Sequence, residues 1–355
     1  MRFWWYIYID DDGNLVMLVV DKYSGYTMMR GFVSYGAIVR NVDFAYRILR
    51  DAFNLLGYTI PNSQASIAAS NVDGITLDVV NNRILVSLAV YTDDKISLFR
   101  EYVIDAPYLV FHQSPGRLST GLEQSYLLCK YYGHNLYYEF DEQLFMPSNI
   151  TTVRVGDGIY LRDSADFLRM SGSVGYRITI SGANGFVTAA HLPDPRTQRP
   201  IAPGAWIYDR NGTHIGRVHS TRLSDIDTAI VTLMPGVTMT NHTGRGTITG
   251  RTIGSIVGRT VILDARNGRN REGVIQASFS GFATSSTGTL WINNGRRATY
   301  SSWGGDSGGI VYSWQENGVN GMHVGGWTAG TWPDGGNALF IPADNIDFFL
   351  NVRPN

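Results

Sequence analysis

Three short strings in the second half of the chain carry residues that could act together in catalysis. They are FVTAAH, ending at His191, DIDTAIV, which contains Asp227, and GGDSGG, which contains Ser307. A serine hydroxyl is a weak nucleophile until an imidazole takes its proton, and that imidazole needs a carboxylate to hold its tautomer. A histidine, an aspartate and a serine in this order therefore indicate nucleophilic acyl transfer, with His191 as base and Ser307 as nucleophile.

Glycines surround the serine and let the backbone turn so that amide N–H groups converge on one point. A tetrahedral oxyanion would develop there, and we expect Gly305 and Ser307 to donate to it. The aspartate has an alternative, because Asp225 lies two residues before Asp227 and on the same side of a strand. Asp227 is favoured because TAIV, which follows it, continues as an apolar strand.

The histidine and serine strings resemble the motifs of chymotrypsin-fold serine proteases. Within that group, SVGYR at 173–177 followed by GFVTAAH at 185–191 is similar to the bacterial streptogrisin and α-lytic protease branch. VGDGIY at 155–160 resembles the start of a mature streptogrisin, so the resemblance covers about residues 152–355. It implies an all-β double barrel with the triad in the cleft, and a serine endopeptidase acting on peptide or protein substrates.

The resemblance also implies where the substrate pocket lies. In the family the residue six before the nucleophile lines the pocket floor, which is Ser301 here, and the segment matching Thr328, Ala329 and Gly330 forms a wall. None of them supplies a carboxylate, and a buried cation without a partner is costly. We therefore expect uncharged side chains before the scissile bond, unless the loop of Asp334 folds back to the pocket rim.

Cysteine usage departs from the family. Members commonly have cysteines near both motifs, whereas Leu192 follows His191 and Trp303 precedes the glycines here. Cys129 is the only cysteine, so neither an intramolecular disulfide nor a cysteine-rich zinc site can form. The histidines make no recognisable metal spacing, and the chemistry requires neither a metal nor an organic cofactor.

The elements that could position these residues after position 150 are short apolar strands between turns. Short apolar strands are expected at Tyr176–Ile180, Gly185–Ala189, Ala205–Tyr208, Ala229–Leu233, Val261–Leu263, Gly309–Tyr312 and Met322–Trp327. No long helix interrupts them, and 31 of the 40 glycines lie in this half. Many short strands between glycine-rich turns favour an all-β barrel or sandwich.

The first half has an α+β pattern. A hairpin is expected where Phe3–Ile9 and Leu15–Val20 flank Gly13, and a helix over 44–56 that Gly57 ends. A β-α-β unit follows over 83–111. We therefore predict an α+β region at 1–151 and a protease domain at 152–355. Relatives carry an N-terminal pro-domain, and 105–118 is similar to the tail of such a region, which implies an intramolecular inhibitor.

Composition excludes several other classes. The formal net charge is −1, which supplies no field for nucleic acid or anionic lipid, and 44% hydrophobic residues indicate globular cores. Arg259, Arg266, Arg269 and Arg271 form a local basic cluster, interpreted as the solvated flanks of a hairpin turn at Asn267-Gly268. Phe3–Ile9 is too short for a membrane span and lacks a signal-peptide cleavage site, so the secretion that the resemblance implies stays open.

A rival interpretation comes from another class of protein. The chain could be a catalytically silent module that keeps a protease fold and its cleft for peptide capture. Loss of a triad member would be the expected sign of such a module, and all three residue types are present.

Overall fold

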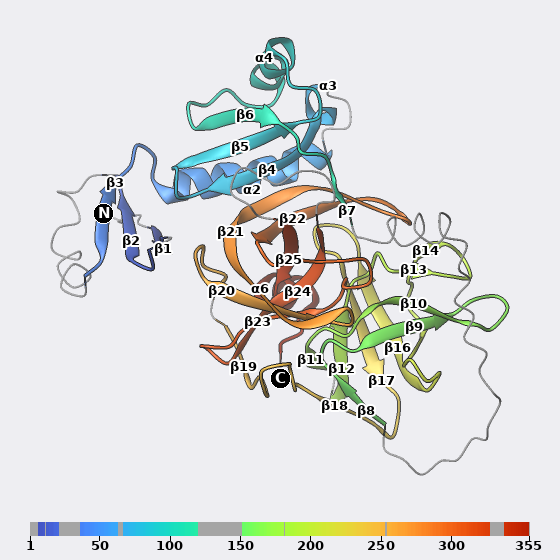
Figure 1. Ribbon diagram of the computed structural model, residues 1–355. Coiled ribbons are helices and arrows are strands. Elements are labelled where there is room, and N and C mark those ends of the chain that lie inside the picture. The colour runs from blue at the N-terminus through green and yellow to red at the C-terminus, as the bar shows by residue number, and fades with distance from the viewer. Residues whose placement is uncertain are drawn as a thin grey trace.

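The computed structural model describes residues 6–10, 12–20, 36–62, 67–119, 151–180, 182–252, 254–326 and 337–354 (Figure 1). The N-terminal half contains β1 (Tyr6–Ile9), β2 (Leu15–Val19), β3 (Ile38–Asn41), α2 (Tyr46–Asn62), α3 (Ile67–Ser70), β4 (Val72–Asp78), β5 (Arg83–Leu88), α4 (Asp93–Tyr102), β6 (Leu109–Gln113) and β7 (Leu118–Ser119). The C-terminal half begins with β8 (Thr151–Arg154), β9 (Gly158–Arg162), β10 (Leu168–Ser173), β11 (Arg177–Ile180), β12 (Ala183–Thr188), β13 (Pro193–Asp194), β14 (Arg199–Pro200), β15 (Trp206–Tyr208), β16 (His214–Arg222), β17 (Thr228–Leu233) and β18 (Val237–Thr240). It continues with β19 (Gly250–Arg251), β20 (Thr260–Ala265), β21 (Gly268–Ser285), β22 (Gly288–Ala298), β23 (Ile310–Ser313), β24 (Gly318–Gly326), β25 (Ala338–Pro342) and α6 (Ala343–Leu350).

The described part of the C-terminal half is built mainly from two large β-sheets, with β13-β14 and β18-β8 as separate two-stranded pairs. Within the described residues the first runs in the order β10-β9-β15-β16-β17-β12-β11. In the second, β20-β23-β24-β25-β22-β21 returns on itself because β20 also pairs with β21, which closes a barrel. Alternating burial along β9 and β21 gives these strands one face toward the core. The fold class predicted from the sequence, mostly β with an α+β region before it, is confirmed.

The N-terminal region adds its own strands to the barrel. β4 pairs antiparallel with β21 through Ser278↔Leu77, Phe279↔Thr76, Ser280↔Ile75 and Gly281↔Gly74. β5 and β6 extend the sheet outward, and Figure 1 shows all three stacked above the barrel. At Gly74 an added Cβ would lie 2.6 Å from the Phe279 ring, so glycine is what lets the two strands approach.

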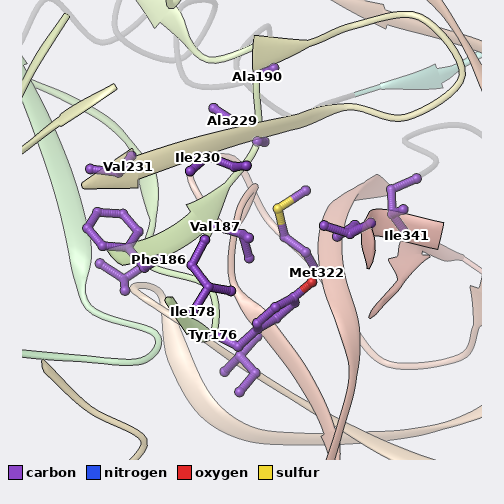
Figure 2. Close-up of a cluster of buried hydrophobic side chains, with 14 of the residues drawn as sticks. Tyr176, Ile178, Phe186, Val187, Ala190, Ala229, Ile230, Val231, Met322 and Ile341 are labelled. Atoms are coloured by element: carbon purple, nitrogen blue, oxygen red, sulfur yellow. The ribbon is translucent and has the colours of Figure 1, made fainter. Parts of the chain in front are cut away.

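Two hydrophobic cores hold these parts together. One fills the first sheet and the inner side of the barrel, where Phe186, Val187 and Val231 of the first sheet share a cluster with Met322 and Ile341 of the second (Figure 2). The other joins the N-terminal region to the barrel and includes Phe53, Ile75, Val86, Val261 and Phe340, all nearly inaccessible to solvent. Burial of apolar surface on this scale makes docking of the N-terminal region favourable.

The structure corrects one expectation in the N-terminal half, the end of the first helix. The helix α2 runs through Gly57 to Asn62, and a Cβ at Gly57 would lie 2.7 Å from Oδ1 of Asn293 on β22. Gly57 therefore serves close packing and does not end the helix. The predicted hairpin is present as β1 and β2, with Gly13 at φ +82°, and the β-α-β unit is present as β5, α4 and β6.

Candidate active site

His191 and Asp227 lie side by side because their strands are neighbours. β12 ends at Thr188 and β17 begins at Thr228, and the two strands pair antiparallel with Thr188 opposite Ala229. His191, three residues beyond the end of β12, is thereby brought next to Asp227, the residue just before β17. Both side chains are fully buried, which removes competing water from the contact between them.

The Asp227 carboxylate holds both the ring and the backbone of the histidine segment. Oδ2 accepts a very short hydrogen bond from His191 Nδ1. Oδ1 accepts from the backbone N–H of Ala190 at 2.9 Å and of His191 at 2.8 Å. This arrangement puts the proton of a neutral imidazole on Nδ1 and leaves Nε2 as the basic nitrogen.

The rival carboxylate points elsewhere. Asp225 has a left-handed backbone with φ +67°, and its side chain is 37% exposed. Its Oδ2 accepts from Arg222 at 3.1 Å. The structure therefore places Asp227, and not Asp225, against His191.

Ser307 lies on a loop of the barrel that a buried ion pair anchors. Asp306 Oδ2 lies 2.5 Å from Arg271 Nη1 and accepts from the Trp303 backbone N–H at 2.6 Å. The same Arg271 nitrogen donates to the Ser301 carbonyl at 3.0 Å, and its guanidinium lies 4.8 Å from the centre of the Trp303 ring. The interpretation of Arg271 as a solvated flank is wrong, because its side chain is only 9% exposed.

The rest of the basic cluster is also engaged with acids or is partly buried. Arg269 pairs with Asp157 at 2.9 Å, and Arg259 pairs with Glu316 at 2.8 Å. Burial lowers the pKa of Arg266, which lies over Gly305. The predicted hairpin is present as β20 and β21, but its arginines contact neighbouring loops and are not free in solvent.

Contacts between the two sheets bring the serine loop to the histidine segment. The Ser307 carbonyl accepts from the Ser173 N–H at 2.8 Å, and the Ser173 hydroxyl donates to the Gly305 carbonyl at 2.8 Å. Gly308 has φ +93°, and a Cβ there would lie 2.3 Å from Oγ1 of Thr188 on β12. Only glycine permits this approach of the nucleophile loop to the strand that leads to His191.

The hydroxyl of Ser307 is not hydrogen-bonded to the histidine in this structure. Ser307 Oγ donates to the Val324 carbonyl of β24 at 2.8 Å. His191 Nε2 is buried and has no hydrogen-bond partner among the described residues. The His191 ring is therefore oriented by Asp227 with Nε2 unpaired among the described residues, while the Ser307 hydroxyl is bound to a neighbouring strand.

The predicted oxyanion and pocket residues are placed in part. Gly305 is buried with φ +92°, and within the described part of the chain no group accepts from its amide. Ser301 is exposed, and its carbonyl is the Arg271 acceptor. Thr328, Ala329 and Gly330 lie outside the described residues, as does Asp334, so the pocket wall stays a prediction.

A short N-terminal strand lies next to β24. β7 pairs antiparallel with β24 at Ser119↔Gly326 and parallel with β21 at Ala283↔Leu118 and Thr284↔Ser119. Gly326 is two residues beyond Val324, whose carbonyl holds the Ser307 hydroxyl. The N-terminal strand β7 thus contacts β24, the strand whose Val324 carbonyl binds the Ser307 hydroxyl.

A second histidine is buried beside the site. His323 precedes Val324, and its Nδ1 lies 3.1 Å from the Tyr300 hydroxyl. The pKa of His323 is lowered to about 3, chiefly by burial and with smaller contributions from the neighbouring Arg271 and His191, while Asp306 acts in the opposite direction. The sequence motifs gave no reason to single out His323, Val324 or Arg271.

No metal centre or membrane-spanning helix is found in the part of the chain that the structure describes. There, no group of three or more histidine, cysteine or acidic residues is arranged to hold an ion. None of the described helices is long and apolar enough to cross a bilayer.

Comparison with known proteins adds a match in the other half of the chain. Residues 48–114 match a family model described as "Pro-like C-terminal domain", inside the region predicted to be a pro-domain. The predicted resemblance is confirmed. A search of curated proteins gives no match.

Solved structures of bacterial proteases are also similar. Protease A of Thermobifida fusca is 21% identical, with 57% of this chain and 98% of that chain covered, at a TM-score of 0.45. A Nocardiopsis protease is 23% identical, with 58% and 100% covered, at 0.44. An α-lytic protease homologue, N4, is 21% identical, with 57% and 98% covered, at 0.43.

Proposed function

We propose that the chain is a serine endopeptidase that hydrolyses peptide bonds through an acyl-enzyme. The observation that carries the proposal is the buried His191–Asp227 pair beside the loop of Ser307. The two oxygens of Asp227 bind the ring and the backbone of the histidine segment, and the ring nitrogen left over is the one a base would use. The carboxylate on Nδ1 and on two backbone amides distinguishes His191 from His323, which is also buried and whose Nδ1 lies 3.1 Å from the Tyr300 hydroxyl.

In the proposed reaction the Ser307 hydroxyl turns from Val324 toward His191. Nε2 takes the hydroxyl proton as Oγ attacks the scissile carbonyl, and the Gly305 and Ser307 amides stabilise the resulting oxyanion. The imidazolium, stabilised by Asp227, then gives its proton to the leaving amine. Water, deprotonated by the same Nε2, releases the acyl group and restores the serine.

The N-terminal region is proposed to act as an intramolecular inhibitor. Three features support this: β4 extends the barrel sheet, β7 pairs with β24 at Gly326, and the Ser307 hydroxyl is bound to Val324 in the full chain. A peptide substrate that added a strand to β24 would compete with β7 for the Gly326 backbone.

Cleavage that releases this region is predicted between about Met146 and Arg154. Residues 120–150 lie outside the described part, whereas Thr151–Arg154 form β8, which pairs with β18. A cut inside β8 would remove hydrogen-bonded strand residues from the C-terminal half. The cut is therefore expected before Thr151, and N-terminal sequencing of the active species tests it.

Fluorophosphonate labelling of the purified chain tests the proposed activity. We expect Ser307 to be labelled and Ser307→Ala to be inert and to stay full length. The adjacent carboxylates provide a matched pair. Asp227→Asn should lower kcat by about 10⁴, because loss of this carboxylate allows the wrong tautomer of the catalytic imidazole in serine proteases. Asp225→Asn should leave kcat within twofold of wild type.

The silent peptide-binding module is favoured by one observation, the hydrogen bond of Ser307 to Val324 in place of His191. It predicts no labelling at any pH from 5 to 9, even after the N-terminal region has been removed. Labelling of wild type but not of Ser307→Ala rejects it.

A further inference from the structure

The catalytic histidine segment is also held from the barrel side, by a residue outside the three motifs. The turn between β21 and β22 reaches across to the first sheet, and the Thr287 hydroxyl donates to the His191 carbonyl at 3.0 Å. His191 N–H is bound to Asp227 at 2.8 Å. The peptide groups on both sides of His191 are thus fixed, one by each sheet.

The turn that presents Thr287 is itself braced by hydroxyl groups. Ser285 pairs with Gly288 across the hairpin, leaving a two-residue loop. Ser285 Oγ accepts from the Thr287 N–H at 3.1 Å and lies 2.8 Å from Thr287 Oγ1. Because Thr287 gives its single hydroxyl proton to His191, its oxygen is the acceptor from Ser285, whose proton is shared with the Gly288 carbonyl at 3.0 Å.

We propose that Thr287 is a positioning residue that sets the placement of His191 relative to the Ser307 loop. His191 and Asp227 belong to the first sheet, whereas Ser307 belongs to the barrel, so the pair alone does not fix the distance between base and nucleophile. Thr287 belongs to the barrel and binds the His191 backbone directly. The Thr287 hydroxyl therefore links the backbone of His191 to the barrel that carries Ser307.

The same hairpin carries the N-terminal region. β4 pairs with β21 at 278–281 and β7 pairs with it at 283–284, immediately before Ser285. Thr287 thus lies just beyond the end of β21, the strand with which β4 and β7 of the N-terminal region pair. The same hairpin therefore binds both the docked N-terminal region and the His191 backbone.

Replacement of Thr287 by valine tests the inference, which rests on the proposed function. Valine keeps the shape and removes the hydroxyl. We expect kcat to fall about 3- to 10-fold with KM unchanged, the effect of losing one positioning hydrogen bond. Thr287→Ser, which keeps the hydroxyl, should stay within twofold of wild type.

The matched control is Thr289→Val. Thr289 lies two residues further along the chain, in β22, is exposed, and its side chain makes no hydrogen bond among the described residues. It should leave kcat unchanged. The melting temperatures of both valine variants show whether either substitution destabilises the fold. A wild-type kcat for Thr287→Ser, together with an unchanged melting temperature for Thr287→Val, assigns the effect to the lost hydroxyl.

The outcomes separate the two claims. An active wild type with Thr287→Val equal to it in kcat overturns the positioning role and leaves the proposed function intact. A wild type that is neither labelled nor active after removal of the N-terminal region overturns both. A fall in kcat for Thr287→Val, with serine rescue and a silent Thr289→Val, supports the inference.

Discussion

Replacing Arg271 with methionine should destabilise the chain far more than the same replacement of an exposed arginine. The Asp306 side chain is fully buried, and Arg271 is its charged partner at 2.5 Å. Methionine fills similar volume but leaves a buried carboxylate without a counter-charge. Breaking one side of a buried pair costs about 3 to 5 kcal/mol of unfolding free energy.

The same change should slow catalysis. Arg271 also holds the Ser301 carbonyl at 3.0 Å and stacks on Trp303, so both ends of the loop before Ser307 depend on it. A displacement of the nucleophile by about 1 Å can cost about 10² in rate. We expect kcat for hydrolysis of a small peptide to fall by about this factor in the Arg271→Met chain.

Urea unfolding and the rate of fluorophosphonate labelling measure the two effects. The control is Arg353→Met, which breaks a pair with Asp347 at 2.9 Å in which the arginine is 73% exposed, and should cost about 1 kcal/mol or less. Adding Asp306→Asn to Arg271→Met removes the unpaired charge and should recover part of the loss. An Arg271→Met loss as small as that of the control would refute the reasoning.

Other measurements address the remaining features. Ser307→Ala should abolish hydrolysis and keep the wild-type circular dichroism; residual activity near wild type would contradict the triad. Because burial lowers the pKa of His323 to about 3, the unfolded chain binds one more proton than the folded chain between about pH 6.5 and 3, so stability should decrease by about 1.4 kcal/mol for each unit that the pH is lowered through this range. His323→Gln should flatten this slope in urea titrations, and an unchanged slope would count against it. Gly74→Ala, which pushes on the Phe279 ring, should speed labelling of Ser307 in the full chain, whereas Gly250→Ala, with only an ordinary 3.5 Å contact, should not; equal rates would deny that β4 docking restrains the site. A peptide library should favour uncharged side chains before the scissile bond, and a dominant preference for arginine or lysine would reject the expected pocket.

The His191–Asp227 pair of the proposed active site could be predicted because local pattern and chemistry agree. Asp227 precedes an apolar strand and His191 follows one, and the structure makes those strands neighbours. The choice against Asp225 depends on a left-handed backbone that aspartate adopts only occasionally, which no strand pattern reveals. The pair was found from the sequence, whereas the reason for its geometry required the fold.

Long-range contacts were out of reach of the same reasoning. The predicted hairpin turn at Asn267-Gly268 places Arg271 on a solvated flank, whereas its partner Asp306 lies 35 residues away in the sequence. Thr287 sits among serines, threonines and glycines that indicate only a turn. Gly57 follows an apolar helical pattern and so resembled a stop, until the approach of Asn293 showed why a side chain is excluded. Each depends on a partner that periodicity does not name.

The strand pairing between β4 and β21 has a consequence for the chain after the N-terminal region is lost. Residues 278–281 would then expose a row of unsatisfied backbone donors and acceptors along one side of β21. Such an edge is a template for addition of another strand, and this one contains Gly281 and two serines, with no charge or proline to discourage pairing. Freed of its N-terminal half, the C-terminal half should self-associate as its concentration rises, and a lysine at Ser280 should restore its solubility.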